Sequence, residues 1–368
     1  MRVLWITNVP SPYRVDFFNE LGKSCDLTVV FEKRTSDERD KSWLDYKFEN
    51  FNGIFLNGKS INTDTAICPG VVKYVKDKGY DHIVVTNISS PTGIIAIAYM
   101  RANHIPYWIE GDGGFAKADR GIKHKLKTFM ITGAKGYFST SKSHDEYYLS
   151  YGADPQRIHR YPFTSIKKED ILKADLLTDS DKKTLRKQLK MNEPNIILSV
   201  GRFSYEKGYG KGFDLLMETA EMLGKDYGVY IVGDEPTDEF KGWKDEHNLL
   251  NVHFVPFLRK NELAKYYAAA DCMVLLTRGE SWGLVINEAM VYGLPIITTP
   301  QCVAGTELVE DGVNGFIVSI NDIDDITNKI KRSMKPEYKS LLGQASYEKI
   351  KDFTIEKMAQ THIEDMGG

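Results

Sequence analysis

Short apolar runs rich in β-branched residues recur along the whole chain, and longer stretches with helical spacing of apolar positions separate them. In the first half these runs predict strands at Val3–Thr7, Leu27–Phe31, Ile83–Thr86, Tyr107–Glu110, Gly136–Thr140 and Ile158–Arg160. In the second half they predict strands at Ile196–Gly201, Val229–Gly233, Val252–Val255, Cys272–Leu276, Ile296–Thr298 and Phe316–Val318. Strands that alternate with helices form parallel sheets covered on both faces. The pattern therefore predicts an α/β fold with doubly wound parallel sheets.

The alternation is interrupted between Ile166 and Asn195, where the densely charged run KKEDILKADLLTDSDKKTLRKQLK indicates a linker followed by a surface helix. A chain of 368 residues has room for two domains of ~150 residues each. We therefore expect an N-terminal domain over residues 1–165, and a linker with a C-terminal domain over residues 166–352. Ligands of doubly wound sheets bind at the carboxyl ends of strands, which here predicts a site in a cleft between the domains.

Composition and charge exclude several classes of protein. A net charge of −3 argues against a nucleic-acid binder, whose affinity comes from neutralising phosphates. The 4 cysteines form no CxxC pair and are expected to be reduced, without a disulfide frame or a zinc site. The chain enters a strand pattern directly at MRVLWITN, and no apolar run approaches the ~20 residues that span a bilayer. We therefore expect a cytoplasmic protein.

The segment richest in chemistry, residues 277–295, follows the strand predicted at Cys272–Leu276. Ser281 is expected to cap a helix that starts near Gly283, and the backbone N–H groups at such a helix start favour an anion. Glu280 precedes this helix and Glu288 lies within it. Two carboxylates at this place would repel a phosphate but would accept hydrogen bonds from hydroxyls, such as those of a sugar and a ribose. A solvated loop acid with a helix-surface acid is the alternative.

A second segment, residues 199–216, also runs from a strand through a glycine-rich turn into a helix. Arg202 and one or two lysines of this turn supply the fixed positive charge that a diphosphate leaving group needs. The segment lacks the Walker pattern GxxxxGK[ST], and no GxGxxG follows the first strand of either half. Because both segments follow strands of one predicted sheet, we expect them to form a joint site.

These segments together resemble the donor site of retaining, nucleotide-sugar-dependent glycosyltransferases of family four. The run GESWGLVINEAMVYGLPIITT carries the family's two acidic positions, at Glu280 and Glu288. Further segments that resemble family elements are Gly201-Arg202 with the following lysines, IVGDEP at 231–236, VHFVPF at 252–257 and GTELV at 305–309. The resemblance covers residues 195–320 in order and is diffuse over the first half.

The resemblance implies a GT-B fold: two Rossmann-like, doubly wound parallel-sheet domains facing a central cleft, with a C-terminal helix at about 353–368 packed back on the first domain. It implies that Glu288 binds the ribose hydroxyls, that Glu280 binds a hydroxyl of the donor sugar, and that Arg202 and a lysine neutralise the diphosphate. The residues expected to act in catalysis are Arg202, Lys211 and Glu280. Those expected to bind the donor are Gly201, Lys207, Gly233, Val255, Phe257, Gly283, Leu284, Val285 and Glu288.

The identity of the phosphate lysine stays open. Counted from Arg202, Lys207 holds the family spacing. Counted back from the following helix, Lys211 is the better match, and we favour it because its position relative to the helix start decides where its ammonium points. Tyr209-Gly210 is an insertion relative to the family pattern.

The first half supplies candidates for binding the acceptor. Pro12 and Arg14 follow the first strand, in a loop with prolines where the family often has glycines. Arg14 is expected either to serve an anionic acceptor or to form a surface ion pair. Asp112 and Gly113 lie in EGDGG after the strand at Tyr107–Glu110, where glycines let the backbone approach a ligand. A plain tight turn is the alternative for EGDGG.

The run AKADRGIKHKLKTFM at 116–130 predicts a basic amphipathic helix. Such a helix rests on anionic lipid at the inner face of the cell membrane or is simply solvated. The scattered histidines, His144 and His253 among them, are expected to be core or surface residues, and no metal or cofactor is expected.

The sequence thus predicts an enzyme that moves a hexose or N-acetylhexosamine from a nucleotide-sugar, UDP favoured over GDP, to a glycan or lipid-linked acceptor in bacterial surface polysaccharide synthesis. The alternatives are a nucleotide-sugar epimerase of the same fold and a catalytically dead nucleotide-sugar-binding subunit. An epimerase would need no acceptor, and a dead copy would be free to lose Glu280, Glu288 and Arg202.

Overall fold

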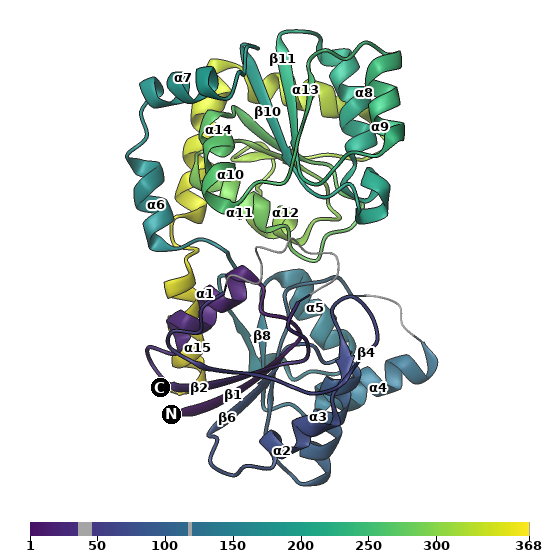
Figure 1. Ribbon diagram of the computed structural model, residues 1–368, viewed down its shortest axis with the longest axis vertical. Coiled ribbons are helices and arrows are strands. Elements are labelled where there is room, and N and C mark those ends of the chain that lie inside the picture. Colours follow the sequence, from purple (N-terminus) through teal and green to yellow (C-terminus); the bar gives the residue numbers. More distant parts are fainter. Residues whose placement is uncertain (36–45, 117–119, 368) are drawn as a thin grey trace. The chain divides into compact units, whose positions relative to one another are not determined.

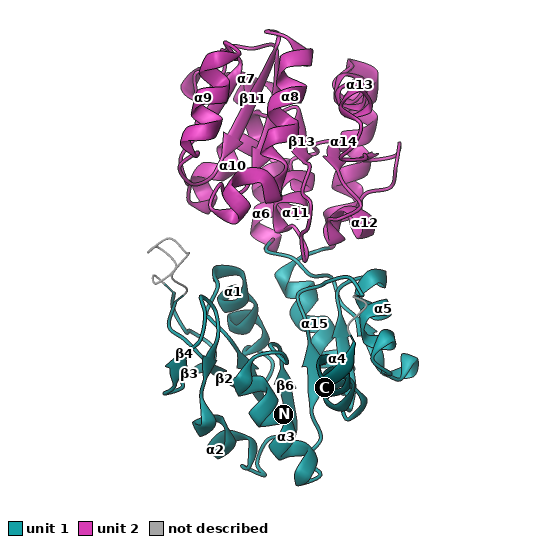
Figure 2. Ribbon diagram, turned by 90° about the vertical axis from the view of Figure 1, so that its right-hand side faces the viewer, with its two compact units in different colours: residues 1–165, 353–368 teal, residues 166–352 magenta. Residues whose placement is uncertain are grey.

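The computed structural model describes residues 1–35, 46–116 and 120–367. The chain divides into two units, of which one comprises Met1–Ser165 with Phe353–Gly368 and the other Ile166–Asp352. The two units are coloured separately in Figure 2. Each unit is built around its own parallel sheet, so each is described by itself.

The sheet of the first unit has seven strands in the order β3-β2-β1-β6-β7-β8-β9, all parallel. Strands β1, β2, β7 and β8 are almost wholly buried, as expected for a sheet covered on both faces. The strands are β1 (Arg2–Thr7), β2 (Asp26–Phe31), β3 (Asn52–Phe55), β6 (His82–Val85), β7 (Trp108–Glu110), β8 (Gly136–Ser139) and β9 (Ile158–Arg160), and a two-stranded ribbon pairs β4 (Lys59–Ser60) with β5 (Ala66–Ile67).

The helices of this unit include the last one of the chain, which packs against the first. Figure 1 shows this last helix, in yellow, beside the purple α1. His362 fixes it in the core, fully buried with its ring 4.2 Å from that of Phe138. The helices are α1 (Pro12–Leu21), α2 (Val72–Val75), α3 (Pro91–Ala102), α4 (Gly121–Thr132), α5 (Lys142–Ser150) and α15 (Ile355–Met366).

The sheet of the second unit has six parallel strands in the order β12-β11-β10-β13-β14-β15. They are β10 (Asn195–Val200), β11 (Tyr227–Val232), β12 (Val252–Val255), β13 (Cys272–Leu275), β14 (Ile296–Thr298) and β15 (Gly315–Ile317). The helices are α6 (Lys168–Asp175), α7 (Asp179–Gln188), α8 (Phe213–Leu223), α9 (Asp238–Glu246), α10 (Lys260–Ala269), α11 (Leu284–Val291), α12 (Val303–Leu308), α13 (Ile323–Ser333) and α14 (Pro336–Ile350).

Every strand predicted from the sequence is present, with its ends within two residues of the prediction. The sequence missed β3 and the β4–β5 ribbon. Strand β3 is a half-buried edge strand that contains Asn52-Gly53, a pair that favours a turn when read locally, and it forms because β2 offers a paired edge. The interrupted segment 166–195 contains two helices, α6 and α7, where the sequence predicted one.

Candidate functional site

Most of the predicted donor residues gather at one edge of the second sheet. Gly201 follows β10, Gly233 follows β11, Val255 ends β12 and Glu280 lies beyond the end of β13. Because neighbouring strands are parallel and in register, these ends meet at the carboxyl edge of the sheet. The strand order thus brings together segments that lie far apart in the sequence.

The turn after β10 places Lys211 beside Glu280. Lys211 Nζ forms an ion pair with Glu280 Oε2, and both side chains are largely buried, with 15% and 23% of their surface exposed. A Cβ at position 201 would lie 3.1 Å from Lys211 Cγ. Glycine at this position therefore leaves room for the aliphatic chain of Lys211. Residues expected to act together on the donor are therefore in direct contact.

Lys207 has a different environment. Within the 3₁₀ segment η4 (Tyr205–Lys211), Glu206, Lys207 and Gly208 have positive φ values of 48°, 55° and 92°. A run of left-handed residues that includes two non-glycines is strained and persists only where its surroundings impose it. Lys207 is exposed on this turn, whereas the ammonium of Lys211 lies beside Glu280.

Three side chains to which the sequence analysis gave no role, those of Arg278, Asp214 and Thr277, hold this turn against the next loop. Arg278 donates to both carboxylate oxygens of Asp214, at 2.7 and 2.6 Å, and to the carbonyl of Tyr209 at 2.6 Å. Thr277 Oγ1 and the Arg278 N–H add bonds to the carbonyl of Gly210 at 2.9 and 3.0 Å. The Asp214 carboxylate raises the pKa of Arg278. Arg278 and Asp214 both lie inside the segments singled out from the sequence, but their pairing is visible only in three dimensions.

The helix that carries Glu288 begins at Leu284, close to the start near Gly283 that the sequence predicted, but its capping residue differs. Gly283, not Ser281, is the residue that precedes α11, and its φ of 108° suits glycine. A Cβ at Gly283 would lie 2.8 Å from the Sγ of Cys302. Ser281 remains exposed, because Trp282 turns inward and its indole N–H donates to Asn287 at 2.8 Å. The helix starts at Leu284, followed by Val285, and both are half-buried.

Glu288 is half-buried on α11 and accepts a hydrogen bond from the hydroxyl of Tyr267 at 2.9 Å. Tyr267 comes from α10, is itself buried, and stacks on Tyr292 with ring centroids 5.8 Å apart and an interplanar angle of 16°. Burial is the main reason that the pKa of Tyr267 is raised, so its hydroxyl keeps its proton and donates. The hydrogen bond from Tyr267 thus fixes the position of the Glu288 carboxylate.

The ends of β11 and β12 complete the edge. The Gly233 N–H donates to the carbonyl of Val255 at 3.0 Å, and a Cβ at Gly233 would lie 1.8 Å from the carbonyl oxygen of Gly201. Glycine at 233 is therefore required by packing. Asp234 accepts from the backbone N–H groups of Phe203 and Ser204, which fixes the backbone just after Arg202. Phe257 is 46% exposed.

The first unit has a cavity of about 640 Å³ at the carboxyl ends of β1, β6 and β7. Asp112 and Gly113 line it, together with Glu110 and His144. Burial lowers the pKa of His144 to about 4, so its imidazole is neutral near pH 7. The sequence grouped His144 with unremarkable core or surface histidines, and only its place beside the EGDGG loop makes it a candidate.

Arg14 lies in α1, outside the described lining of this cavity, and so does Pro12, the first residue of α1. The Arg14 guanidinium donates to both oxygens of Glu110 at 2.8 Å and also pairs with Asp112. Since Arg14 and Glu110 are 3% and 0% exposed, the surface ion pair that the sequence allowed is wrong. Arg14 instead orders the loop that carries Asp112, and it holds the pKa of Glu110 down at about 2 against the effect of burial.

Across the described residues, no group of three or more His, Cys, Asp and Glu side chains is placed to hold a metal ion. Of the helices that the structure describes, none is both long and apolar enough to cross a membrane. Part of the predicted basic helix, residues 117–119, lies outside the described residues.

Comparison with known proteins supports the resemblance seen in the sequence. Residues 181–351 match the model of the family "Glycosyl transferases group 1". A glycosyltransferase of Haemophilus influenzae without assigned function is 31% identical over 191 residues, 48% of this chain and 50% of that protein. WaaG, a lipopolysaccharide glucosyltransferase of Escherichia coli K12, is 30% identical over 111 residues, 30% of this chain and 29% of that protein. The match thus spans half or less of the length of these relatives.

Solved structures match over nearly the whole chain. Anabaena HepE in complex with UDP and glucose has a TM-score of 0.76 at 17% identity, covering 99% of this chain and 98% of that one. The crystal structure of WaaG has a TM-score of 0.69 at 16% identity and covers 100% of both chains. At such low identity a likeness establishes the fold alone. The chain has the GT-B fold, as the sequence predicted.

Proposed function

Through residues 181–351 this chain belongs to the glycosyl transferases group 1 family, and we propose that it transfers a hexose or N-acetylhexosamine from a nucleotide-sugar with retention of configuration. The donor is a UDP-sugar in preference to a GDP-sugar. The acceptor is a glycan or a lipid-linked sugar of a bacterial surface polysaccharide. Relatives named for such chemistry support this, among them the lipopolysaccharide glucosyltransferase WaaG and HepE, whose crystals contain UDP and glucose.

The observation that carries the proposal is the meeting of Lys211 and Glu280 at the carboxyl edge of the second sheet, beside the start of α11. A cation, a hydroxyl acceptor and a row of free backbone N–H groups are what a sugar diphosphate requires. Glu280 holds the ammonium of Lys211, whose aliphatic chain passes Gly201, so the charge is already in place before a donor binds.

In the proposed reaction the bond between the sugar and the diphosphate breaks, and negative charge grows on the departing phosphate oxygen. Arg202 and Lys211 stabilise that charge more in the transition state than in the ground state, which is what accelerates the step. The N–H groups at Leu284 and Val285 bind the phosphates, and Glu288 accepts from the ribose hydroxyls. Val255 and Phe257, at the end of β12, contact the base. The acceptor hydroxyl attacks from the same face, and its proton passes to the departing phosphate.

The acceptor occupies the cavity of the first unit, where Asp112 faces hydroxyl groups and Gly113 keeps the backbone accessible. No resident metal or cofactor takes part in the proposed reaction.

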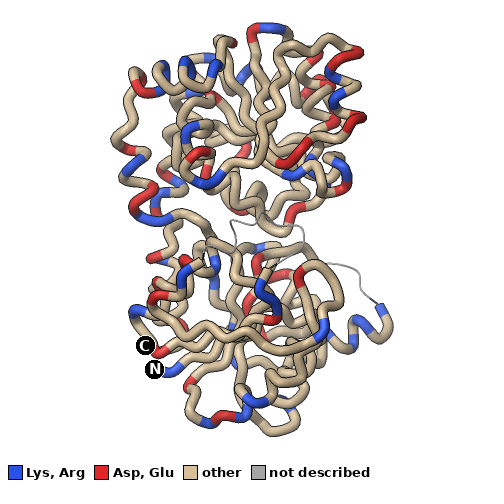
Figure 3. Tube along the Cα trace, in the orientation of Figure 1, with Lys and Arg blue, Asp and Glu red and all other residues tan. Residues whose placement is uncertain are grey.

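A lipid-linked acceptor would benefit from contact with a membrane, and α4 has the required surface. Ile122, Leu126 and Phe129 are 86%, 36% and 43% exposed and share one face of this helix. Figure 3 shows Lys and Arg along the same helix. Lys127 does not contribute, because it is buried and donates to the hydroxyl of Tyr151 at 3.2 Å. We therefore place the enzyme in the cytoplasm, at the inner face of the cell membrane.

The first test is thermal unfolding with UDP, GDP, ADP and their sugar conjugates, without and then with a divalent metal. A ligand at 100 times its Kd stabilises the folded protein by about 2.7 kcal/mol, which is easily measured. Stabilisation by uridine compounds in the absence of metal is the expected result. If no nucleotide stabilises the protein, the donor site is wrong.

A transfer assay then separates the alternatives. The proposed enzyme releases UDP from its donor only when an acceptor is present, whereas an epimerase turns over its donor alone and a dead subunit binds without turnover. Arg202→Ala is expected to depress turnover well beyond its effect on donor affinity. Equal losses in both would make Arg202 a binding residue only.

A further inference from the structure

A second cavity, of about 560 Å³, lies at the opposite edge of the sheet in the second unit. Asp271 lies immediately before β13 and Leu294 shortly before β14, and both line the cavity. The proposed donor residues instead follow the strands. Since all strands of this sheet are parallel, the cavity is at the amino edge and is separate from the donor site. Its other walls come from the α6–α7 connection, the end of α11 and α14.

One end of this cavity carries surplus positive charge. The Asp271 carboxylate pairs with Lys182 at 3.1 Å, Lys339 at 3.0 Å and Arg186 at 2.5 Å, so three cations surround one carboxylate. These cations hold the pKa of Asp271 at about 2 although burial alone would raise it. The exposed Asp179 also lines this end and reduces the surplus to one charge, that of Arg186, which pairs with Asp271 from outside the cavity lining. Lys182 and Lys339 stay 28% and 41% exposed, so their ammonium groups can donate to an anion in the cavity.

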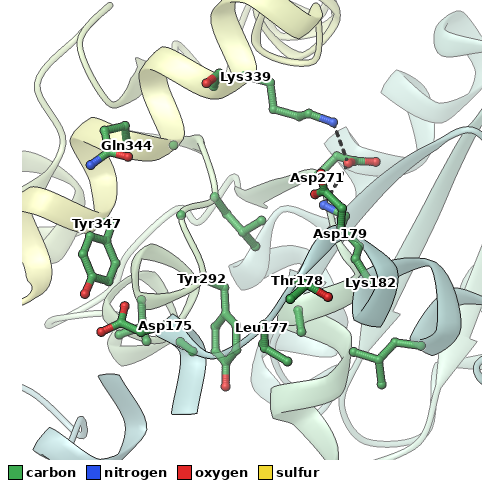
Figure 4. A pocket seen from close by; sticks show the side chains of 18 of the residues that line it. Asp175, Leu177, Thr178, Asp179, Lys182, Asp271, Tyr292, Lys339, Gln344 and Tyr347 are labelled. Carbon is green, nitrogen blue, oxygen red and sulfur yellow. Dashed lines mark hydrogen bonds and ion pairs between the residues drawn. The ribbon is translucent and has the colours of Figure 1, made fainter. Parts of the chain in front are cut away.

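The opposite end presents groups that bind hydroxyls. Figure 4 shows Asp175, Tyr292, Gln344 and Tyr347 together, across the cavity from Lys339 and Lys182. Tyr347 donates to Asp175, and this bond raises the pKa of Tyr347 to about 12. A carboxylate, an amide and two phenols supply both donors and acceptors, along with ring surface for an apolar sugar face. The cavity therefore separates an anion-binding end from a hydroxyl-binding end.

We propose that this cavity binds a phosphorylated monosaccharide, with its phosphate on Lys182 and Lys339 and its hydroxyls on Asp175, Gln344 and Tyr347. The volume falls in the range of ~300–1,000 Å³ that is usual for small-molecule sites. A neutral sugar would leave the surplus charge at the basic end unmatched, and a bare phosphate would leave the hydroxyl-binding end unused.

The cavity is connected to the donor site by direct contacts. Tyr292 lines it and stacks on Tyr267, which donates to Glu288. A ligand that orders Tyr292 therefore orders the side chain proposed to bind the ribose, and it raises the affinity for a nucleoside diphosphate. By linkage, the nucleotide raises the affinity for the sugar phosphate by the same factor. This coupling rests on the proposed function, but the binding in the cavity does not.

The experiment is calorimetric titration of the full chain, without nucleotide, using glucose 1-phosphate, glucose 6-phosphate, mannose 6-phosphate, glucose and inorganic phosphate. At least one sugar phosphate is expected to bind, and to bind at least about tenfold more tightly than glucose or phosphate, because each of those uses only one end of the cavity. Lys339→Gln and Gln344→Ala are expected to weaken it by roughly tenfold. Lys349→Gln, an exposed lysine of the same helix outside the cavity, is the matched control. Thermal unfolding without ligand checks that each variant is folded.

A donor-site variant, Lys211→Met, must keep the sugar-phosphate affinity. Loss of binding in Lys211→Met would place the ligand in the donor site and overturn the proposal. So would binding that Lys339→Gln leaves unchanged, equal binding of inorganic phosphate or glucose, or no binding by any of the sugar phosphates. UDP titrations with and without the sugar phosphate then test the coupling, which Tyr267→Phe is expected to abolish while leaving the cavity affinity intact. Sugar-phosphate binding without any UDP binding would refute the proposed function and leave the cavity site standing.

Discussion

Arg278 and Asp214 form a two-pronged ion pair, with both guanidinium Nη atoms donating to the two carboxylate oxygens at 2.7 and 2.6 Å. The pair joins the loop after β13 to the first turn of α8 and clamps η4, the turn that ends at Lys211. The Asp214 side chain is 10% exposed and that of Arg278 is 33% exposed, so water screens the pair only in part. We infer that it positions the proposed phosphate-binding turn and does not itself contact the donor.

Arg278→Lys keeps the charge but loses the planar fork, so the turn loosens. We expect UDP affinity to fall several-fold and the free energy of unfolding to fall by about 1 kcal/mol or less, since the pair is partly exposed. Titration calorimetry and thermal unfolding measure the two effects. Arg157→Lys, at an exposed pair of the first unit, serves as the control. An unchanged UDP affinity would show that the clamp is not needed for binding.

Lys211→Met and Lys207→Met decide which lysine binds the diphosphate. Lys211 lies beside Glu280 at the carboxyl edge of the sheet, whereas Lys207 is exposed on a strained turn. We expect Lys211→Met to lower UDP affinity by roughly tenfold or more, as for the loss of a charge-assisted contact, and Lys207→Met to lower it much less. The reverse order would assign the phosphate to Lys207.

Gly283→Ala tests the start of α11. A φ of 108° is unfavourable for alanine, and the new Cβ would lie 2.8 Å from Cys302 Sγ. We expect a loss of more than ~1 kcal/mol in the free energy of unfolding, together with weaker UDP binding. Gly279→Ala is the matched control, because its Cβ meets open space. Equal stability of the two variants would mean that the helix start can adjust.

Because Glu110 is buried as an ion pair with Arg14, we expect the free energy of unfolding to fall in acid. The pKa of Glu110 is lowered from 4.5 to about 2 in the folded protein, so the ionised form favours folding. Its contribution, on the order of 3 kcal/mol, is complete above about pH 5 and is lost as pH falls toward 2. Asp271, lowered from 3.8 to about 2, adds to the same loss in the second unit. Denaturant unfolding followed between pH 6 and 2.5 measures this decline.

Arg14→Met leaves Glu110 buried without its cation and is expected to cost about 3–5 kcal/mol at pH 7. Adding Glu110→Gln to this variant removes the buried charge and is expected to recover part of the loss and to flatten the acid dependence. A double variant no more stable than Arg14→Met would attribute the loss to packing of the arginine alone.

Vesicle sedimentation tests the membrane contact proposed for α4. Ile122→Ser combined with Lys125→Gln removes an apolar and a basic group from the exposed face. We expect roughly a tenfold weaker association with vesicles that contain anionic lipid, since each basic residue near the surface contributes about 1 kcal/mol. Leu341→Ser with Lys349→Gln, both exposed on α14, is the control. If the α4 variant associates with the vesicles as strongly as the unchanged protein, α4 is a solvated helix without a membrane contact.

The order of strands and helices could be predicted from the sequence, because alternating short apolar runs and helical patterns are local signals that burial on both faces of a parallel sheet imposes. The segments with Arg202, Glu280 and Glu288 could be found for the same reason, since each follows a strand and combines glycines with charged residues. Edge strand β3 was not predicted from the sequence, because it forms by pairing with β2 and its own residues do not favour a strand.

Tertiary structure alone decided which charges meet. Arg14 carries no local sign that it is buried against Glu110, 96 residues away, and Lys211 none that Glu280 is its partner. The order of strands in each sheet sets the distances between these residues. Because a buried charge is costly without a partner of opposite charge, burial then fixes which residues pair. The cap of α11 also depended on tertiary packing: the sequence predicted Ser281, but Trp282 packs inward and Gly283 is the residue that precedes the helix.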